Sequence, residues 1–331
     1  MNHLTGKNLI TVKKDGTGDF TTLTEAFAKA ETFPLEQPVE IRVGAGIYKE
    51  KLSLEKDYVT LTGESAEDTI ITYDDYALFL MEDGIKRGTF RSYTMYVHGD
   101  AFVAKNVTIA NTAGFGAKVG QAVALYADGA KMKFENCRFL GRQDTLFTAP
   151  LPPTVVEWGG FRGPRENAPR DHGVHYYKNC YIEGDVDFIF GGATAYFEGC
   201  QIHSLTRDQE VNGYVTAAST PEGKEYGYVF ESCRFTSDCA SETVYLGRPW
   251  RSFAKTVILH SELGAHIKRE GWHDWNKEEV KETTFYAEYQ NFGPGAAGNG
   301  RVDWSRCLND EEAEFYSKER VLRKLIETGM E

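Results

Sequence analysis

The sequence predicts an all-β fold, a parallel β-helix in which short strands wind into stacked turns. Three observations lead to this prediction. A pattern of aromatic, polar, small, cysteine, any and apolar residue recurs along the chain. Its copies start at Phe134, Tyr177, Phe197 and Phe230, and a fifth copy, starting at Ala104, has valine in place of cysteine. The shortest step between copies, about 20 residues, suits one turn of a solenoid whose units bury their apolar faces by stacking. Alternation within the pattern, which would turn the aromatic ring and the cysteine to different faces, predicts strands.

Helices are expected only at the two ends of the chain. Residues 20–32 show helical spacing of Phe27 and Ala30, with Thr24 as the expected N-cap. Residues 311–327 repeat apolar residues at the same spacing. We interpret the first as a helix that caps the open end of the solenoid and the second as a C-terminal helical tail.

The step from Cys137 to Cys180 is too long for one turn and contains a segment rich in Pro, Gly and Arg. We expect a single domain over residues 1–331 with a long loop inserted at about residues 149–172, because insertions in solenoids map to loops on one face. This loop would either form a wall of a cleft or decorate the surface.

Composition excludes several classes of function. The formal net charge of -12 argues against a nucleic-acid partner, and no apolar run approaches the roughly 18 residues of a membrane span. Residues 1–11 lack the apolar run of about 7 to 15 residues found in secretory signals, so we expect a cytoplasmic protein as the sequence stands, or a secreted one if a signal has been removed. The six cysteines form no Cys-x-x-Cys pair and are expected to be buried free thiols.

Two carboxylates, two amides and one arginine supply the chemistry of an ester hydrolase. Asp187 is the candidate nucleophile: its apolar neighbours would raise its pKa, whereas an adjacent arginine, for which we select Arg248, would lower it. Asp144 would act as the acid and then as the base, with a pKa raised by an ionised Asp187. Gln121 and Gln143 are neutral donors suited to an oxyanion. This chemistry requires no cofactor and no metal ion.

Two other functions stay open on these residues alone. A lyase or glycosidase on the same fold would need a calcium-binding carboxylate cluster or carboxylates that flank a glycosidic bond, and neither requires paired glutamines. A non-catalytic carbohydrate-binding solenoid would tolerate loss of any of the five polar residues. His172 and His175 are too sparse to form a metal site.

The order of four motifs resembles the pectin methylesterase (pectinesterase) family. They are QAVAL at 121–125, QDTL at 143–146, DFIFG at 187–191 and LGRPW at 246–250, and further matches lie at 15–20, 46–50, 111–114, 271–275 and 289–296. The resemblance covers nearly the whole chain and implies the single-stranded, right-handed, pectin lyase-like form of the parallel β-helix. It departs from the family in the long interval between Asp144 and Asp187.

The resemblance also implies an activity and its residues. The expected reaction removes methyl groups from galacturonate C6 esters in pectin or methylated oligogalacturonides and releases methanol. Asp187 would be the nucleophile, Asp144 the acid and base, Gln121 and Gln143 the anion hole, and Arg248 the partner of Asp187. Trp250, Trp275, Phe190 and Thr112 would contact the sugar. We expect a monomer, and a walled cleft would favour short chains.

Overall fold

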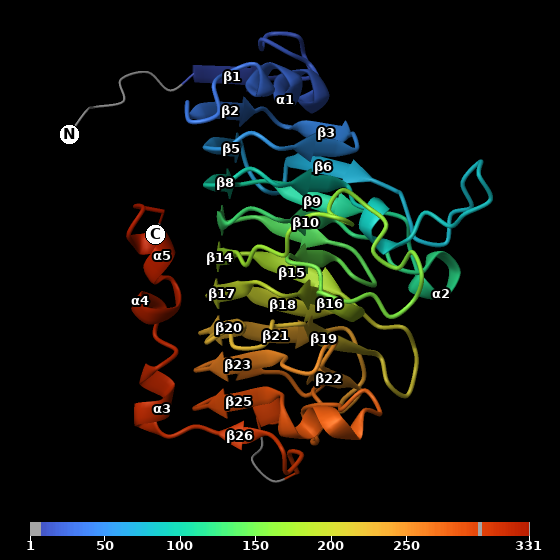
Figure 1. Ribbon diagram of the computed structural model, residues 1–331, viewed down its shortest axis with the longest axis vertical. Coiled ribbons are helices and arrows are strands. Elements are labelled where there is room, and N and C mark those ends of the chain that lie inside the picture. Colours follow the sequence, from blue (N-terminus) through green and yellow to red (C-terminus); the bar gives the residue numbers. More distant parts are fainter. Residues whose placement is uncertain (1–7, 297–299, 331) are drawn as a thin grey trace.

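The computed structural model describes residues 8–296 and 300–330, and within them the chain winds into three parallel sheets (Figure 1). In spatial order, the first sheet contains β1 (Asn8–Val12), β2 (Val39–Val43), β5 (Val59–Gly63), β8 (Phe102–Lys105), β11 (Lys131–Glu135), β14 (Val174–Lys178), β17 (Thr194–Glu198), β20 (Tyr228–Glu231), β23 (Lys255–Leu259), β25 (Phe285–Tyr289) and β26 (Arg306–Cys307). The second contains β3 (Gly46–Lys49), β6 (Thr69–Tyr73), β9 (Thr108–Asn111), β12 (Arg138–Leu140), β15 (Tyr181–Gly184), β18 (Gln201–Ser204), β21 (Arg234–Ser237) and β24 (Glu262–Leu263). The third, called the cleft sheet below, contains β4 (Leu52–Leu54), β7 (Met95–Val97), β10 (Leu125–Ala127), β13 (Leu146–Thr148), β16 (Val186–Gly191), β19 (Gly213–Ala218) and β22 (Val244–Gly247).

The recurring sequence pattern forms the corner between the first and second sheets. In the copy at 134–139, β11 ends at Glu135, Asn136 takes a left-handed conformation with φ of 54°, and β12 begins at Arg138. The equivalent residues Asn179, Gly199 and Ser232 also have positive φ, and asparagine and glycine tolerate this region best.

The predicted alternation within this pattern is wrong, because the left-handed residue reverses the direction of the side chains. Phe134 and Cys137 therefore both point into the core, where each is fully buried. The aromatic rings of successive copies stack along the solenoid axis, with centroids 4.9 Å apart for Phe134 and Tyr177 and 4.6 Å apart for Tyr177 and Phe197. Each turn thus buries its rings against its neighbours.

All six cysteines are free thiols, and four of them are buried. Those four are Cys137, Cys180, Cys200 and Cys233 of the recurring pattern. The expectation of burial is wrong for Cys239, which is partly exposed, and for Cys307, which is exposed. Both lie outside the recurring pattern and its inward-pointing position.

The N-terminal helix α1 (Leu23–Glu31) covers the first turn of the solenoid, as expected. Its N-cap, however, is Thr22, whose hydroxyl accepts from the backbone N–H of Glu25, so the assignment of Thr24 is wrong. The Thr24 hydroxyl instead donates to Glu50 at 2.6 Å. The local helical pattern does not predict this contact, because the two residues are 26 positions apart in the sequence. Leu23, Ala26, Phe27 and Ala30 form the buried face of this helix.

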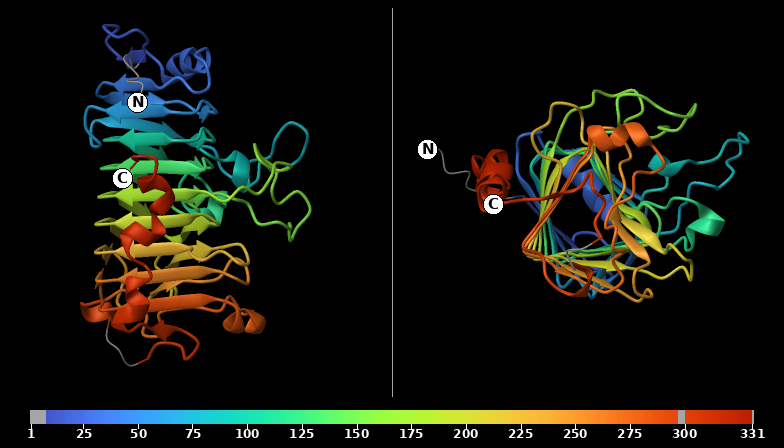
Figure 2. Two further views of the ribbon diagram at one scale, coloured as in Figure 1. Left: turned by 60° about the vertical axis from the view of Figure 1, so that its left-hand side comes forward. Right: turned by 90° about the horizontal axis from the view of Figure 1, so that it is seen from below.

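The C-terminal tail runs back along the outer face of the first sheet as three short helices (Figures 1 and 2). These are α3 (Asp310–Glu314), α4 (Lys318–Val321) and α5 (Arg323–Ile326) rather than one continuous helix over 311–327. Asn309 and Glu312 form a capping box at the start of α3. Leu322 and Leu325 are fully buried against outward-facing residues of the sheet such as Tyr196 and Val229, so the tail removes an apolar sheet face from water.

The remaining helical elements are short, namely α2 (Gly116–Val119), η1 (Thr89–Arg91), η2 (Glu278–Glu282) and η3 (Pro294–Ala296). No helix within the described ranges has the length and apolar character needed to cross a membrane.

Candidate active site

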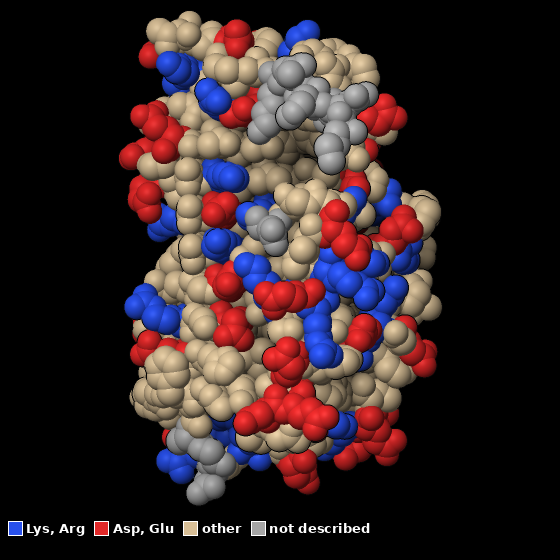
Figure 3. All heavy atoms as spheres, turned by 90° about the vertical axis from the view of Figure 1, so that its left-hand side faces the viewer, with Lys and Arg blue, Asp and Glu red and all other residues tan. Residues whose placement is uncertain are grey.

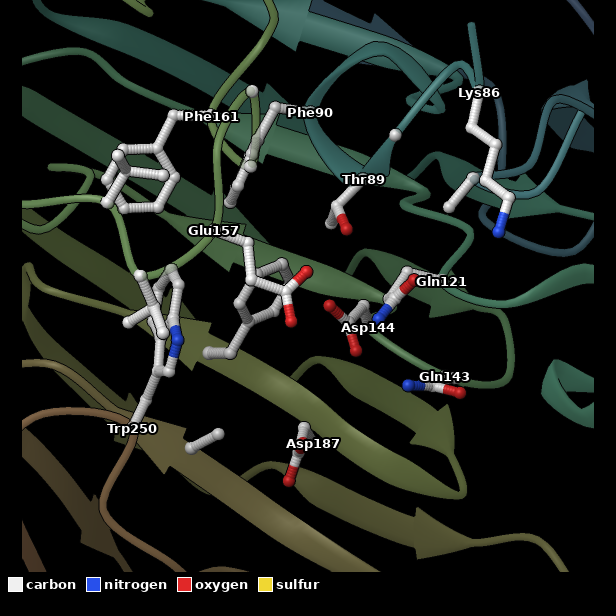
Figure 4. Close-up of a pocket in the computed structure, with 18 of the residues that line it drawn as sticks. Lys86, Thr89, Phe90, Gln121, Gln143, Asp144, Glu157, Phe161, Asp187 and Trp250 are labelled. Atoms are coloured by element: carbon white, nitrogen blue, oxygen red, sulfur yellow. The ribbon is translucent and has the colours of Figure 1, made fainter. Parts of the chain in front are cut away.

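The motif residues meet in a cleft of about 470 Å³ on the outer face of the cleft sheet. Gln121 precedes β10, Gln143 and Asp144 precede β13, Asp187 lies at the start of β16, and Arg248 follows β22. Because β10, β13, β16, β19 and β22 are successive neighbours in the sheet, residues far apart in sequence become adjacent on one wall. Figure 4 shows Asp144 between Gln121 and Asp187, with Gln143 beside them.

Asp187 owes its direction to an irregularity in β16. Its φ is 51°, and the register with β19 shifts between Val186 and Ile189. This bulge directs Phe188 into the solenoid core, whereas Asp187 and Phe190 line the cleft. The Asp187 residue is only 6% exposed.

Arg248 holds the Asp187 carboxylate through two parallel hydrogen bonds. Its Nε donates to Oδ1 at 2.8 Å and its Nη2 donates to Oδ2 at 2.7 Å. The guanidinium lies between two aromatic rings, 3.8 Å from the centroid of Tyr214 and 3.7 Å from that of Trp275. The bidentate pair fixes the orientation of the Asp187 carboxylate and holds the positive charge of Arg248 beside it.

The two carboxyl groups differ in pKa. Burial raises the pKa of Asp187 above its ordinary value, although the hydrogen bonds and charge of Arg248 oppose the rise. The pKa of Asp144 rises well above its ordinary value, chiefly because of burial and next because of the negative charge of Asp187. The predicted effect of the arginine is thus present, but burial outweighs it, and Asp144 retains its proton to higher pH than Asp187 does.

The two glutamine side chains lie at the rim of the same cleft. The backbone carbonyls of Gln121 and Gln143 accept from Ala77 and Ala122 at 2.8 and 3.0 Å, which fixes the two segments. Gly116 makes room for Gln143, since a Cβ at that position would lie 2.5 Å from Gln143 Oε1.

Aromatic residues form the other side of the cleft. Trp250, Trp275 and Phe190 line it, whereas Thr112 is exposed outside the cleft lining and its hydroxyl donates to the Tyr73 carbonyl. Contacts between substrate and any of these four residues stay predictions. Sequence reasoning missed Phe90, whose ring stacks on that of Trp250 at 6.3 Å, and nothing in its local sequence marks it.

The segment 149–172 contributes a wall of this cleft. It contains no helix or strand, and its residues Val155, Val156, Glu157, Gly159, Gly160 and Phe161 line the cleft. Arg165 forms an ion pair of 2.7 Å with Asp128, and Arg170 donates to three carbonyls within the loop. Phe161 is buried against Phe90 and Trp250. The exposed side chain of Glu157 points into the cleft, as Figure 4 shows, and sequence reasoning did not single out this residue.

Within residues 8–296 and 300–330, no group of three or more His, Cys, Asp or Glu side chains is arranged to hold a metal ion.

Fold and site together define a carboxylic ester hydrolase built on a right-handed parallel β-helix. The chain belongs to the pectinesterase family, whose model matches residues 9–151 and 171–324. The unmatched residues, 152–170, lie within the loop that walls the cleft.

Individual relatives agree with this assignment. The chain is 36% identical over 317 residues to Pectinesterase 31 of Arabidopsis thaliana, a match that covers 93% of this chain and 90% of the relative. It is similar in structure to the pectin methylesterase from carrot, with a TM-score of 0.81, 30% identity and coverage of 98% and 95% of the two chains. A pectin methylesterase from Erwinia chrysanthemi matches with a TM-score of 0.79, 29% identity and coverage of 96% and 97%.

Proposed function

We propose that the chain hydrolyses methyl esters at C6 of galacturonate residues through a covalent aspartyl intermediate. The observation that carries this proposal is that one cleft holds an arginine-bound Asp187 beside Asp144, whose pKa burial and the charge of Asp187 raise well above its ordinary value. One carboxyl group can attack while its neighbour still has a proton to give. The similarity to pectinesterases and pectin methylesterases supports the same ester chemistry.

The first half of the reaction forms the intermediate. An Asp187 carboxylate oxygen attacks the ester carbonyl carbon, and the amides of Gln121 and Gln143 donate to the negative oxygen of the tetrahedral species. When that species collapses, the bond to the methoxy oxygen breaks, and Asp144 transfers its proton to that oxygen to give methanol. The galacturonyl group is then joined to Asp187 as an anhydride.

The second half restores the enzyme. Asp144, now a carboxylate, takes a proton from a water molecule that attacks the galacturonyl carbonyl. Collapse of the second tetrahedral species breaks the bond to Asp187 and releases galacturonate with a free acid group. Asp144 returns to its protonated form and Asp187 to its ionised form, so one water is consumed and one methanol is produced.

The substrate class follows from the shape and lining of the cleft. Aromatic rings of Trp250, Trp275 and Phe190 offer apolar faces to sugar rings. A related pectin methylesterase has been solved with a hexasaccharide bound. Because the anchored loop 149–172 walls the cleft, we propose that methylated oligogalacturonides are preferred over long pectin chains.

The test is an assay of methanol release from methylated oligogalacturonides and from long pectin, with parallel detection of unsaturated uronide ends and of reducing sugar. Methanol without chain cleavage supports the ester hydrolase, whereas cleavage without methanol contradicts it in favour of a lyase or glycosidase. Asp187→Asn should abolish nearly all methanol release with an unchanged unfolding transition, because asparagine also tolerates positive φ but cannot act as an anionic nucleophile. Equal turnover on long and short substrates would refute the preference for oligomers.

A further inference from the structure

A second groove lies far from the cleft, where the C-terminal tail meets the first sheet. Its volume is about 480 Å³. The residues that define it, here called the basic groove, are His172, Lys224, Tyr226, Phe315, Arg320 and Lys324. They come from the end of the inserted loop, the turn before β20, and the tail. The right-hand view of Figure 2 separates the tail from the loops that extend beyond the cleft sheet, and Figure 3 shows a group of Lys and Arg, with Asp and Glu next to it, on the tail side.

The cations that line this groove outnumber its carboxylates. Among the described residues, Lys224, Arg320 and Lys324 form no ion pair within 4.0 Å, and Arg323 reaches only Glu327 at 3.9 Å. Two carboxylates, Glu225 and Glu319, also line the groove, so its four cations leave a local excess of positive charge. That excess stands out on a chain with a formal net charge of -12.

Interactions made by their neighbours hold the groove residues in position. The Lys255 ammonium donates to the carbonyls of Lys224 and Glu225 at 2.6 and 3.3 Å, which fixes the turn and leaves the Lys224 side chain free to face the groove. The tail is fixed by the burial of Val321 and Leu322 between the exposed cations. His172 adds no charge, because burial lowers its pKa to about 3, with Lys224 and Lys324 contributing.

Aromatic rings lie among these cations. The Tyr226 and Phe315 rings are 5.6 Å apart, and Phe315 is 38% exposed. The Arg320 guanidinium lies 5.6 Å from the Phe315 centroid, so cation and ring share one surface. Apolar ring faces bind the C–H faces of sugars, while guanidinium and ammonium groups bind carboxylates.

We propose that the basic groove is a binding site for de-esterified oligogalacturonate, separate from the cleft. Cations beside aromatic rings match a chain of sugars that each carry one carboxylate, and a fully methylated chain would lack the charges that this groove attracts. The choice of this ligand rests on the proposed function, since de-esterified galacturonate is its product. A polymer with methylated and free stretches could then be held at the groove by its free stretches while a methylated stretch occupies the cleft.

The direct test is calorimetric titration with de-esterified hexagalacturonate, which requires no turnover and so separates failure of this site from failure of the esterase proposal. The triple variant Lys224→Gln/Arg320→Gln/Lys324→Gln should weaken binding by about tenfold, as three exposed charge contacts would. A control triple variant, Lys29→Gln/Arg42→Gln/Lys49→Gln, makes the same change in net charge elsewhere and should bind like wild type. Trp250→Ala, which alters only the cleft, should retain the groove's binding.

Kinetics supply a second readout. On partly de-esterified pectin the groove variant should raise KM with unchanged kcat, and on a short, fully methylated oligomer it should change neither. Three results would overturn the proposal: equal binding by wild type and the groove variant, equal weakening by the control variant, or equally tight groove binding of polyglutamate, which would show that the groove recognises charge without sugar. Unfolding curves of both variants exclude a loss caused by misfolding.

Discussion

Replacement of Arg248 by glutamine tests how the site controls the charge of Asp187. The substitution removes the positive charge while it retains a polar side chain that can donate a hydrogen bond. Asp187 would remain buried, at 6% exposure, without the two hydrogen bonds of 2.8 and 2.7 Å that now oppose its protonation. Its pKa, which burial already raises, should therefore rise further.

The size of this rise can be worked from the geometry. Two unit charges about 4 Å apart at an effective dielectric constant of about 20 interact by about 4 kcal/mol, equivalent to about 3 pKa units. Relaxation and water entry reduce this, so a rise of about 1 to 3 units is expected. Acylation needs Asp187 ionised and Asp144 protonated, so the acid limb of the kcat/KM profile should move up by the same amount and narrow the active pH range.

The assay is methanol release measured across pH for wild type, Arg248→Gln and Arg248→Lys. The lysine variant retains a charge and should recover part of the shift, but not the bidentate geometry. Arg251→Gln is the matched control, because Arg251 lines the same cleft and is not hydrogen-bonded to Asp187. An acid limb that moves by less than about half a pH unit in Arg248→Gln would refute the assignment of that limb to Asp187.

Three further predictions concern the other carboxyl groups and the core. Asp144→Asn should lose turnover but should be more stable than wild type above about pH 4. The pKa of Asp144 is raised in the folded state, so its ionisation destabilises the wild-type fold as pH rises from about 4 towards the native pKa. The free energy of unfolding falls by about 1.4 kcal/mol for each pH unit in that range. Urea unfolding should show that gain at pH 8 and none at pH 3; equal stability of the two proteins at pH 8 would contradict it. Glu157→Gln should lower KM for partly de-esterified oligomers, because the Glu157 carboxylate lines the cleft and repels free carboxylates of the substrate. Glu166→Gln in the same loop should leave KM unchanged, and an unchanged KM for Glu157→Gln at low salt would count against this role. Phe197→Ala should lower the free energy of unfolding by about 3 to 5 kcal/mol, since the Phe197 ring stacks on Tyr177 and Phe230 with centroid distances of 4.6 and 4.5 Å. A loss below about 1 kcal/mol in urea unfolding would show that the stack relaxes around the gap.

The sequence by itself determined the solenoid and the chemical inventory of its site. The recurring aromatic and cysteine positions predict stacked turns, because a unit that small buries its apolar side chains only against copies of itself. Asp144, Asp187 and Arg248 stand in short motifs whose residue types suit ester hydrolysis, and the structure brings them into one cleft. Motifs of this kind are contiguous in the sequence, so they can be recognised without the structure.

The tertiary structure decided the rest, through the geometry of the solenoid corners and through contacts between distant segments. The left-handed conformation of Asn136 directs Phe134 and Cys137 to the same side. A strand periodicity of two places residues three apart on opposite faces, so it does not predict this arrangement. Thr22 rather than Thr24 is the N-cap because the helix begins at Leu23, and the Thr24 hydroxyl instead donates to Glu50 of another turn. Glu157 lines the cleft and Lys224 lies beside the C-terminal tail. Both positions depend on contacts of the loop and the tail with distant parts of the chain. Side-chain environments made by residues so far apart exist only after the solenoid has closed, and they are therefore properties of the tertiary structure.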